Sequence, residues 1–206
     1  MQIIKAGFTI ETEVDGVKIL KEIEQFARNC YKSEGKATET SYLEFVSRLL
    51  HTRKHEGIAD HHVVSCRIII DRGVGNEVVR HRIAAYLQES TRYCDYVKAG
   101  EIQVIDVSRH MTETQLAEWI LAMEDAERHY NNLRGMGCKP EIARDVLPLS
   151  LKTEIIMTLN LTSWRNFFKK RTAPNAHPQL REISIPMLVE FKRLIPVMFD
   201  DIEVKA

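Results

Sequence analysis

Two long stretches of the chain place apolar residues at the spacing of an amphipathic helix. In residues 17–31 the apolar positions recur at helical intervals. Asp15 stands where an N-cap residue would accept hydrogen bonds from the first backbone amides. Residues 113–134 repeat the pattern over a longer span, and Gly135 and Gly137 supply a stop. The sequence therefore predicts two amphipathic helices, the second of them long.

Shorter helices are predicted in several other places. Ser41 followed by Glu44 is a capping-box pair ahead of an apolar run. Further helices are expected around residues 73–82, from Pro140, over residues 163–170 and over residues 178–199, where Pro186 and Pro196 should kink or divide the last one.

Runs rich in β-branched and apolar residues predict strands over residues 2–10, 62–71 and 102–107, and another apolar segment covers residues 151–161. Residues 83–100 are expected to be irregular. Strands interleaved with helices indicate an α/β or α+β fold with a mixed sheet and much helix. The 206 residues suit one domain over residues 1–206, and we find no repeat or linker.

Composition narrows the range of functions. Lys and Arg number 29 and so do Asp and Glu, so no overall field draws the protein to nucleic acid or a membrane. No stretch approaches the ~20 apolar residues of a membrane span, and no signal-type apolar run opens the chain. The four cysteines are far apart and form no CxxC pair. We therefore expect a cytoplasmic protein with no membrane or nucleic-acid partner.

The segment of residues 80–93, RHRIAAYLQESTRY, carries the strongest chemical signal. Neighbouring guanidiniums repel one another unless an anion lies among them, and each presents a planar set of donors that fits phosphate or carboxylate. The interleaved apolar residues Ile83, Ala84, Ala85 and Leu87 suggest partial burial, which argues against a merely solvated basic face. The preceding strand would deliver the segment to a strand end, where ligands tend to bind in α/β proteins. We predict a polyanion site for a nucleotide or phosphorylated cofactor.

The spacing of this segment also resembles a known family. Arg80-His81-Arg82, seven residues and then Ser90 is similar to the signature of the flavin-dependent thymidylate synthases. Other segments agree with that family in the same order and extend the resemblance over roughly residues 51–184: His55 to His61, Ala143-Arg144-Asp145-Val146-Leu147-Pro148, Thr158-Leu159-Asn160, Asn166-Phe167, Arg171, and Gln179 to Ile183. The resemblance implies the family's fold and a homotetramer whose active sites draw residues from several subunits.

The resemblance further implies a reaction and its site. FAD would be the cofactor, dUMP the substrate, and NADPH and methylenetetrahydrofolate the co-substrates in a reductive methylation that yields dTMP. Cofactor contacts are implied for His55, Arg80, His81, Arg82, Gln88, Asn160 and Asn166. Substrate contacts are implied for Glu77, Arg80, Gln88, Glu89, Ser90, Arg92, Arg144 and Arg171. Arg171 is the implied catalytic residue, a fixed cation beside negative charge that develops on the pyrimidine.

The chain departs from the family pattern at several positions. Glu77 replaces a usual glutamine, Gln88 replaces a usual glutamate, and Thr162 replaces a usual arginine. Ala85 and Leu87 stand in place of serine and asparagine. These changes admit a related activity, C5 methylation or hydroxymethylation of another pyrimidine nucleotide such as dCMP.

Two other classes of protein fit parts of the sequence. His55, Asp60, His61 and His62 could hold a metal in a phosphohydrolase. Residues 80–93 and 164–171 interleave basic and aromatic residues as single-strand nucleic-acid modules do, although the zero net charge argues against that function. Ser90 lies in no GxSxG motif, and we interpret Cys66 and Cys94 as structural.

Overall fold

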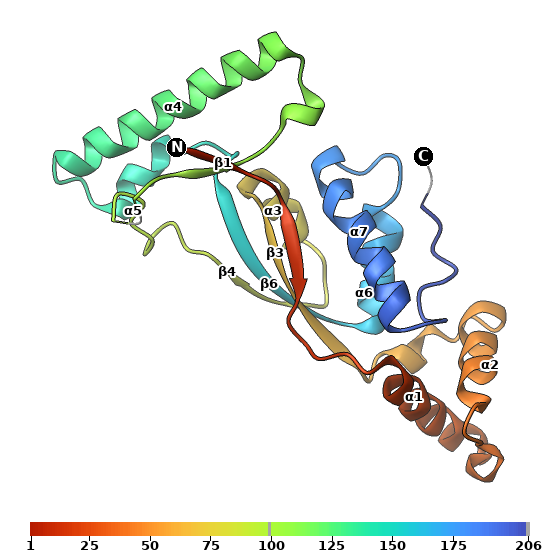
Figure 1. Ribbon diagram of the computed structural model, residues 1–206. Helices are drawn as coiled ribbons and strands as arrows, with labels where there is room; N and C mark the ends of the chain where they lie inside the picture. The colour runs from red at the N-terminus through yellow and green to blue at the C-terminus, as the bar shows by residue number, and fades with distance from the viewer. Residues whose placement is uncertain (99, 205–206) are drawn as a thin grey trace. The chain divides into compact units, whose positions relative to one another are not determined.

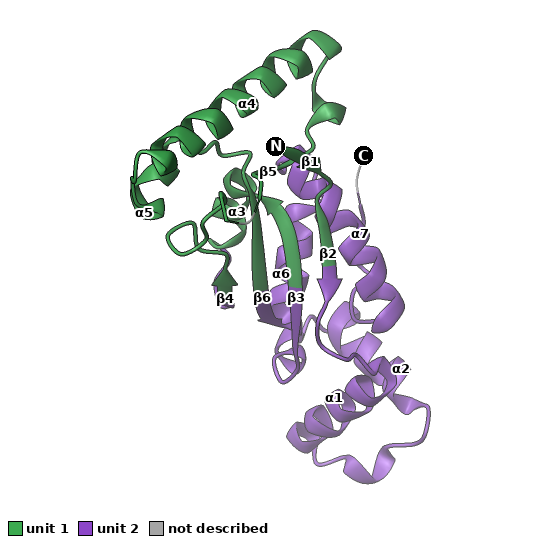
Figure 2. Cartoon of the chain, turned by 60° about the vertical axis from the view of Figure 1, so that its left-hand side comes forward, with its two compact units in different colours: residues 1–8, 67–80, 86–156 green, residues 9–66, 81–85, 157–206 purple. Residues whose placement is uncertain are grey.

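The structure is a computed structural model that describes residues 1–98 and 100–204 (Figure 1). The chain divides into two compact units, each made of interleaved segments (Figure 2). Unit 1 contains residues 1–8, 67–80 and 86–156; unit 2 contains residues 9–66, 81–85 and 157–206. A four-stranded sheet has the order β2-β3-β6-β4, and a separate pair joins β1 to β5. The mixture of helices and sheets confirms the predicted fold class.

Unit 1 begins with the two-stranded pair. β1 (Gln2–Ile4) runs parallel to β5 (Gln103–Ile105), with Gln2 opposite Gln103, and Val104 forms an isolated antiparallel bridge to Leu151. Parallel neighbours need a long connection, and here nearly a hundred residues of chain separate the two strands.

The long helix α4 (Glu113–Gly135) packs against this pair (Figure 1). Thr112 and Gln115 form a capping box at its start. Trp119, Met123 and Leu133 of α4 lie on a buried cluster that comprises Tyr96, Ile102, Val104, Tyr130, Ala143 and Leu151. The short helix α5 (Pro140–Ala143) has its proline in the first turn, where the missing amide costs nothing.

The strands of the four-stranded sheet are β2 (Gly7–Ile10), β3 (Val63–Asp71), β6 (Lys152–Asn160) and β4 (Ala85–Gln88). Burial alternates along β3 and β6, so successive side chains lie on opposite faces, and Arg67, Lys152 and Glu154 lie on the less buried one. At the end of β3, Asp71 caps helix α3 (Arg72–Val78) by accepting a hydrogen bond of 2.6 Å from the Val74 amide.

In unit 2, α1 (Gly16–Tyr31) and α2 (Ser41–Ser47) pack together, and a π-helical turn (Arg48–Thr52) extends α2. Asp15 caps α1 as predicted, with a hydrogen bond of 3.0 Å from the Lys18 amide. A small apolar cluster joins the two helices through Ala27, Phe45 and Leu49. Short 3-10 turns occupy Glu34–Lys36 and Glu56–Ala59 in unit 2, and Ser108–His110 and Arg144–Val146 in unit 1.

The largest apolar cluster of unit 2 lies between α6 (Leu161–Arg171) and α7 (Pro178–Leu194). Its aromatic rings meet mostly edge to face, a favourable arrangement for their quadrupoles: Trp164, Phe167, Phe168, Phe191 and Phe199. The indole of Trp164 donates a hydrogen bond of 3.0 Å to the Val64 carbonyl, so its buried N–H has a partner.

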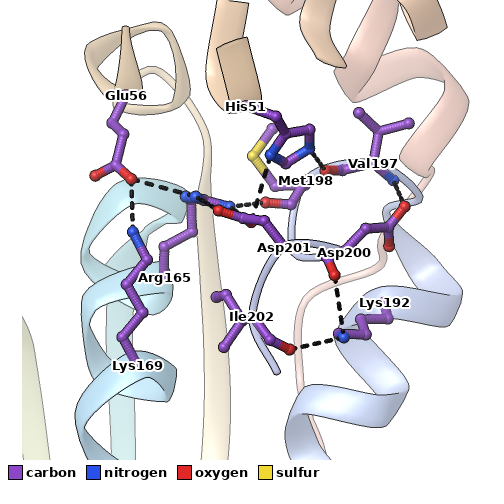
Figure 3. Close-up of polar contacts among 10 residues, drawn as sticks. All are labelled: His51, Glu56, Arg165, Lys169, Lys192, Val197, Met198, Asp200, Asp201 and Ile202. Atoms are coloured by element: carbon purple, nitrogen blue, oxygen red, sulfur yellow. Dashed lines mark hydrogen bonds and ion pairs between the residues drawn. The ribbon is translucent and has the colours of Figure 1, made fainter. Parts of the chain in front are cut away.

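The last turns of the chain are fastened to α6 by a buried guanidinium (Figure 3). Arg165 has no exposed surface, donates two hydrogen bonds of 2.8 Å to the Asp201 carboxylate, and also donates to the Met198 carbonyl. It reaches Glu56 at 3.2 Å, and Lys169 donates to the same carboxylate at 2.6 Å. We call Arg165, Asp201, Glu56 and Lys169 the C-terminal clamp.

Several predicted boundaries were wrong. The opening strand is interrupted at Lys5 and Ala6, and the segment predicted to be irregular contains β4. Ser41 is the first residue of α2 rather than its cap, because its hydroxyl donates to Glu24 instead. α7 runs through Pro186 and ends at Leu194, before Pro196.

Gly16 marks a close approach between the start of α1 and the end of α7. A Cβ atom there would overlap the Leu194 carbonyl oxygen and lie 3.1 Å from the Ile195 Cα. Both obstacles are backbone atoms, so Gly16→Ala is expected to lower the free energy of unfolding by about 2 kcal/mol. Urea unfolding measures the change, and Gly35→Ala is the control, because nothing lies within 4 Å of its Cβ position. Equal midpoints for the two variants would contradict this packing.

Candidate functional site

The predicted site residues divide between the two units. Unit 1 holds those implied to contact substrate, apart from Arg171: Glu77, Arg80, Gln88, Glu89, Ser90, Arg92 and Arg144. Unit 2 holds Arg171 and most of those implied to contact the cofactor: His55, His81, Arg82, Asn160 and Asn166. We describe the two groups separately.

In unit 1, the end of β4 is fixed by a buried threonine on β6. The Gln88 amide donates a hydrogen bond of 3.2 Å to the Thr153 hydroxyl, which has no exposed surface. Arg72 donates to the same hydroxyl at 3.4 Å and to the Glu89 carbonyl at 3.3 Å. β6, through Thr153, and α3, through Arg72, thus hold the side chain of Gln88 and the backbone of Glu89 in place.

The Glu89 carboxylate belongs to a polar network. It accepts hydrogen bonds from the Tyr96 hydroxyl at 3.1 Å and from Lys152 at 2.9 Å. Lys152 also pairs with Glu154 at 2.6 Å, and Arg67 pairs with Glu154 at 3.0 Å. Burial alone would lower the pKa of Lys152, but its bonds to Glu154 and Glu89 outweigh burial and raise it. The network therefore keeps Lys152 charged.

Glu89 and Lys152 line two adjoining hollows on unit 1. One is a cavity of about 390 Å³ lined also by Cys94, Asp95, Tyr96, Glu101 and Gln103. The other is an open groove of about 370 Å³ lined also by Arg67, Leu87, Gln88, Glu154 and Ile156. Both volumes are within the range of small-molecule sites, and charged residues line part of each hollow.

Ser90 begins a tight turn. Its carbonyl accepts hydrogen bonds from the amides of Tyr93 at 3.2 Å and Cys94 at 2.9 Å, and its hydroxyl accepts one from the Arg92 amide at 3.3 Å. The exposed Arg92 pairs with Glu141 at 3.3 Å. An anion bound by Arg92 would therefore compete with a surface carboxylate, which is a weak partner.

Arg144 lies near the same turn and is half-buried. Its guanidinium donates a hydrogen bond of 3.0 Å to the hydroxyl of Thr91, the residue after Ser90. Arg144 thus lies beside the turn that Ser90 begins.

In unit 2, Arg171 is the last residue of α6. Its Nε donates a hydrogen bond of 2.7 Å to Nε2 of His81. The His81 ring is buried and meets Phe167 edge-on, with 5.0 Å between ring centroids. From α7, the buried Ser184 hydroxyl donates a bond of 2.7 Å to the Arg171 carbonyl.

The protonation state of His81 follows from these contacts. Burial, together with the positive charges of Arg171 and Lys170, lowers the pKa of His81 to about 4. The ring is therefore neutral near pH 7 and carries its proton on Nδ1, because Nε2 accepts from Arg171.

This lowered pKa predicts a loss of stability in mild acid. The unfolded chain binds the proton near pH 6.5, whereas folded His81 binds it near pH 4. The neutral His81 ring therefore makes its full contribution to the free energy of unfolding above about pH 6.5. That contribution is lost by about pH 4, a change of roughly 3 kcal/mol. The check is urea unfolding of the wild type and His81→Gln at pH 7, 5.5 and 4.5. His62, whose pKa is also lowered, cancels in the difference between the two proteins. If the free energies of unfolding of the two proteins changed equally with pH, the lowered pKa of His81 would be contradicted.

The other predicted cofactor residues of unit 2 are more exposed. His55 contacts the Tyr31 hydroxyl at 3.3 Å. The Asn160 amide caps α6 by accepting from the Ser163 amide at 2.7 Å, and it donates to Asp60 at 3.1 Å. Arg82 and Asn166 are exposed. At the departure from the family pattern, the Thr162 hydroxyl donates to the Glu56 carbonyl at 2.9 Å, a structural contact.

Two expectations about this region need comment. The apolar residues between the arginines and Ser90 were expected to be partly buried, but Ile83 is 83% and Leu87 75% exposed, so the buried member of the motif is His81. For the metal hypothesis, residues 1–98 and 100–204 contain no group of three His, Cys, Asp or Glu side chains that could hold a metal ion. His62 lies near Glu22, and Asp60 bonds Asn160 instead.

Sequence patterns did not reveal the residues that support the Gln88–Glu89 corner: Arg72, Tyr96, Lys152, Thr153 and Glu154. Residues 152–154 are polar in succession, so the alternating burial of β6 has no matching alternation in the sequence there. Arg72 carried no local signal, because its partners lie far along the chain.

Comparison with known proteins agrees with the motif. The family model described as "Thymidylate synthase complementing protein" matches residues 16–197. A flavin-dependent thymidylate synthase of Geobacter sulfurreducens is 31% identical over 182 residues, which are 85% of this chain and 78% of that protein. One from Mycobacterium sp. (strain JLS) is 30% identical and covers 94% of this chain and 83% of its own length.

Two solved structures share the fold. The UMP/dUMP methylase PolB from Streptomyces cacaoi, bound with 5-Br dUMP, superposes with a TM-score of 0.81 at 18% identity, covering 97% of this chain and 96% of its own. Thymidylate synthase X from Helicobacter pylori, with FAD and dUMP, gives a TM-score of 0.74 at 20% identity, covering 95% and 99%. In the described residues, no helix is both long and apolar enough to cross a bilayer.

Proposed function

Since the chain belongs to the flavin-dependent thymidylate synthase family, we propose that it methylates dUMP to dTMP, with methylenetetrahydrofolate as carbon donor and NADPH as reductant. The match of the family model over residues 16–197 carries this proposal, because it includes every predicted site residue. FAD, when bound and once reduced by NADPH, would supply the hydride that completes the methyl group.

The residues present fit FAD. Arg80 of unit 1 and Arg82 of unit 2 are each exposed, so each guanidinium is open to a phosphate group, and such pairs are strong charge-assisted contacts. His55 and Asn166 are also exposed and offer polar atoms to the flavin ring. We propose that these four residues, with His81 and Asn160, hold the cofactor.

The substrate site is proposed to form around the turn at Ser90. The Ser90 hydroxyl, Arg92 and Arg144 would bind the monophosphate, and the Gln88–Glu89 corner, held by Thr153 and Lys152, would face the rest of the nucleotide. Arg171 would stabilise negative charge at N3 of the pyrimidine, which raises electron density at C5.

Product analysis tests this function. Purified protein with FAD, NADPH and methylenetetrahydrofolate is given dUMP, UMP and dCMP in separate reactions, and the nucleotides are separated by chromatography. We expect dTMP from dUMP and far less product from the other two. A methylated or hydroxymethylated product from dCMP alone would favour the second candidate, C5 modification of dCMP. Two departures from the family pattern support that candidate: Gln88 stands where glutamate is usual, and Glu77 stands where glutamine is usual.

The assembly is proposed to be a homotetramer. Exposed apolar side chains along the motif support it, because Ile83, Leu87 and Tyr93 are each at least 75% exposed, and such patches mark interfaces. Light scattering should give about 95 kDa, four times the chain mass of 23.8 kDa.

We also propose that residues 1–206 form one domain, because β2, β3 and β6 each contribute residues to both units. A single unfolding transition would support this proposal.

A further inference from the structure

Both the side chain and the backbone of Arg171 are hydrogen-bonded. His81 accepts a hydrogen bond of 2.7 Å from the guanidinium Nε, and Ser184 donates one of 2.7 Å to the backbone carbonyl. Ser184 has no exposed surface, and the His81 ring is 8% exposed. Arg171 is therefore held by two groups that are themselves buried.

The bond between Arg171 and His81 allows one arrangement of protons. A guanidinium does not lose a proton in proteins, so its Nε–H must donate and the imidazole must be neutral. A donor that carries charge makes a short, strong hydrogen bond, in keeping with 2.7 Å. The edge of Phe167 against the His81 ring limits rotation of the imidazole. The bond and the Phe167 contact thus restrict where the guanidinium can lie.

Arg171 ends a basic run. Lys169 and Lys170 precede it, so three cations lie in succession in the last turn of α6. Lys169 is drawn to Glu56 at 2.6 Å, and Lys170 is exposed. A long side chain held by one end alone has several rotamers, so few of its conformations would place charge at the pyrimidine.

We infer that His81 is a positioning residue that orients the Arg171 guanidinium toward the reacting pyrimidine, with Ser184 anchoring the backbone of the same residue. The role of Arg171 rests on the proposed function, but its contact with His81 does not. In this arrangement His81 contributes to the chemical step through Arg171, in addition to any contact that it makes with the flavin.

The contact itself is tested without turnover, by NMR titration of the His81 ring in the full chain. Wild-type His81 should titrate near pH 4, and Arg171→Met should raise the midpoint by about one pH unit, because a nearby positive charge is removed. Lys170→Met, which removes a more distant charge, should raise it less. An unchanged midpoint in Arg171→Met would overturn the contact, whatever reaction the protein catalyses.

The positioning role is tested by a double-mutant cycle in kcat, with FAD and nucleotide saturating. His81→Leu should lower kcat by about 10²-fold in the wild type, the cost of a misplaced catalytic group, and by less than about threefold in Arg171→Met. His81→Gln, which keeps an acceptor near the position of Nε2, should recover most of the loss. The KM for dUMP should change little.

Each result of the cycle has one meaning. Equal losses in both backgrounds would overturn the positioning role and assign His81 to the flavin alone. A His81→Leu enzyme with wild-type kcat would overturn it as well. If the wild type makes no methylated nucleotide from dUMP, UMP or dCMP, the proposed function fails, and the positioning role fails with it while the titration still reports the contact.

Discussion

Replacing Arg171 with methionine is expected to lower kcat for dTMP formation by about 10²–10³-fold, with a smaller change in KM. Removing one preorganised charge that faces developing negative charge has this cost in other enzymes, because water cannot reorganise to replace it. Methionine keeps much of the length of the side chain, so α6 and its aromatic cluster should be preserved. Steady-state kinetics at saturating FAD measures the effect.

Lys170→Met is the matched control. It removes a positive charge from the preceding residue, which is exposed and has no proposed part in the reaction. We expect its kcat to remain within about threefold of the wild type, since surface substitutions away from a site are usually mild. Comparable losses in the two variants would mean that the general charge of this helix end, rather than Arg171, supports the reaction.

The second large effect concerns stability. Asp201→Asn is expected to lower the free energy of unfolding by about 3 kcal/mol, because it leaves the Arg165 guanidinium buried without its main counter-charge. We choose the lower end of the usual range because Glu56 stays within 3.2 Å of Arg165. Urea unfolding at pH 7 measures the loss.

Glu190→Gln provides the comparison for the C-terminal clamp. Glu190 also pairs with an arginine, Arg193, but that pair is exposed on α7. Its loss should have little effect on the free energy of unfolding, because solvent screens an exposed ion pair. Burial alone would raise the pKa of Asp201, but the bonds and charge of Arg165 lower it to about 2, so the clamp should survive to about pH 4 and weaken as the pH falls toward 2. Equal losses from Asp201→Asn and Glu190→Gln would contradict this account.

Local signals in the sequence predicted much of the fold. Asp15 caps α1 and Gly135 ends α4, as expected, because caps and helical periodicity depend on residues a few positions apart. β4 was missed because only four residues form it, and the apolar residues that a strand would bury are exposed here. Ser41 shows the same limit, since its hydroxyl bonds Glu24, seventeen positions away.

The site was predicted by its motif rather than by its contacts. The spacing from Arg80 to Ser90 identified the family, which the comparisons confirmed. No pattern could show that His81 accepts from Arg171, ninety positions further on, or that Thr153 fixes Gln88. Such pairs arise from tertiary packing, which places residues together without a local signature. The same holds for Arg165, which the sequence presents as one more cation on α6.

The most direct test of the account is the visible absorbance of the purified full chain after incubation with FAD, before and after dUMP is added. We predict that flavin remains with the protein after the excess is removed, and that its band near ~450 nm shifts when dUMP binds beside it. A protein that stays colourless, or one whose flavin spectrum is unchanged by saturating dUMP, would contradict the claim that flavin and nucleotide share one site.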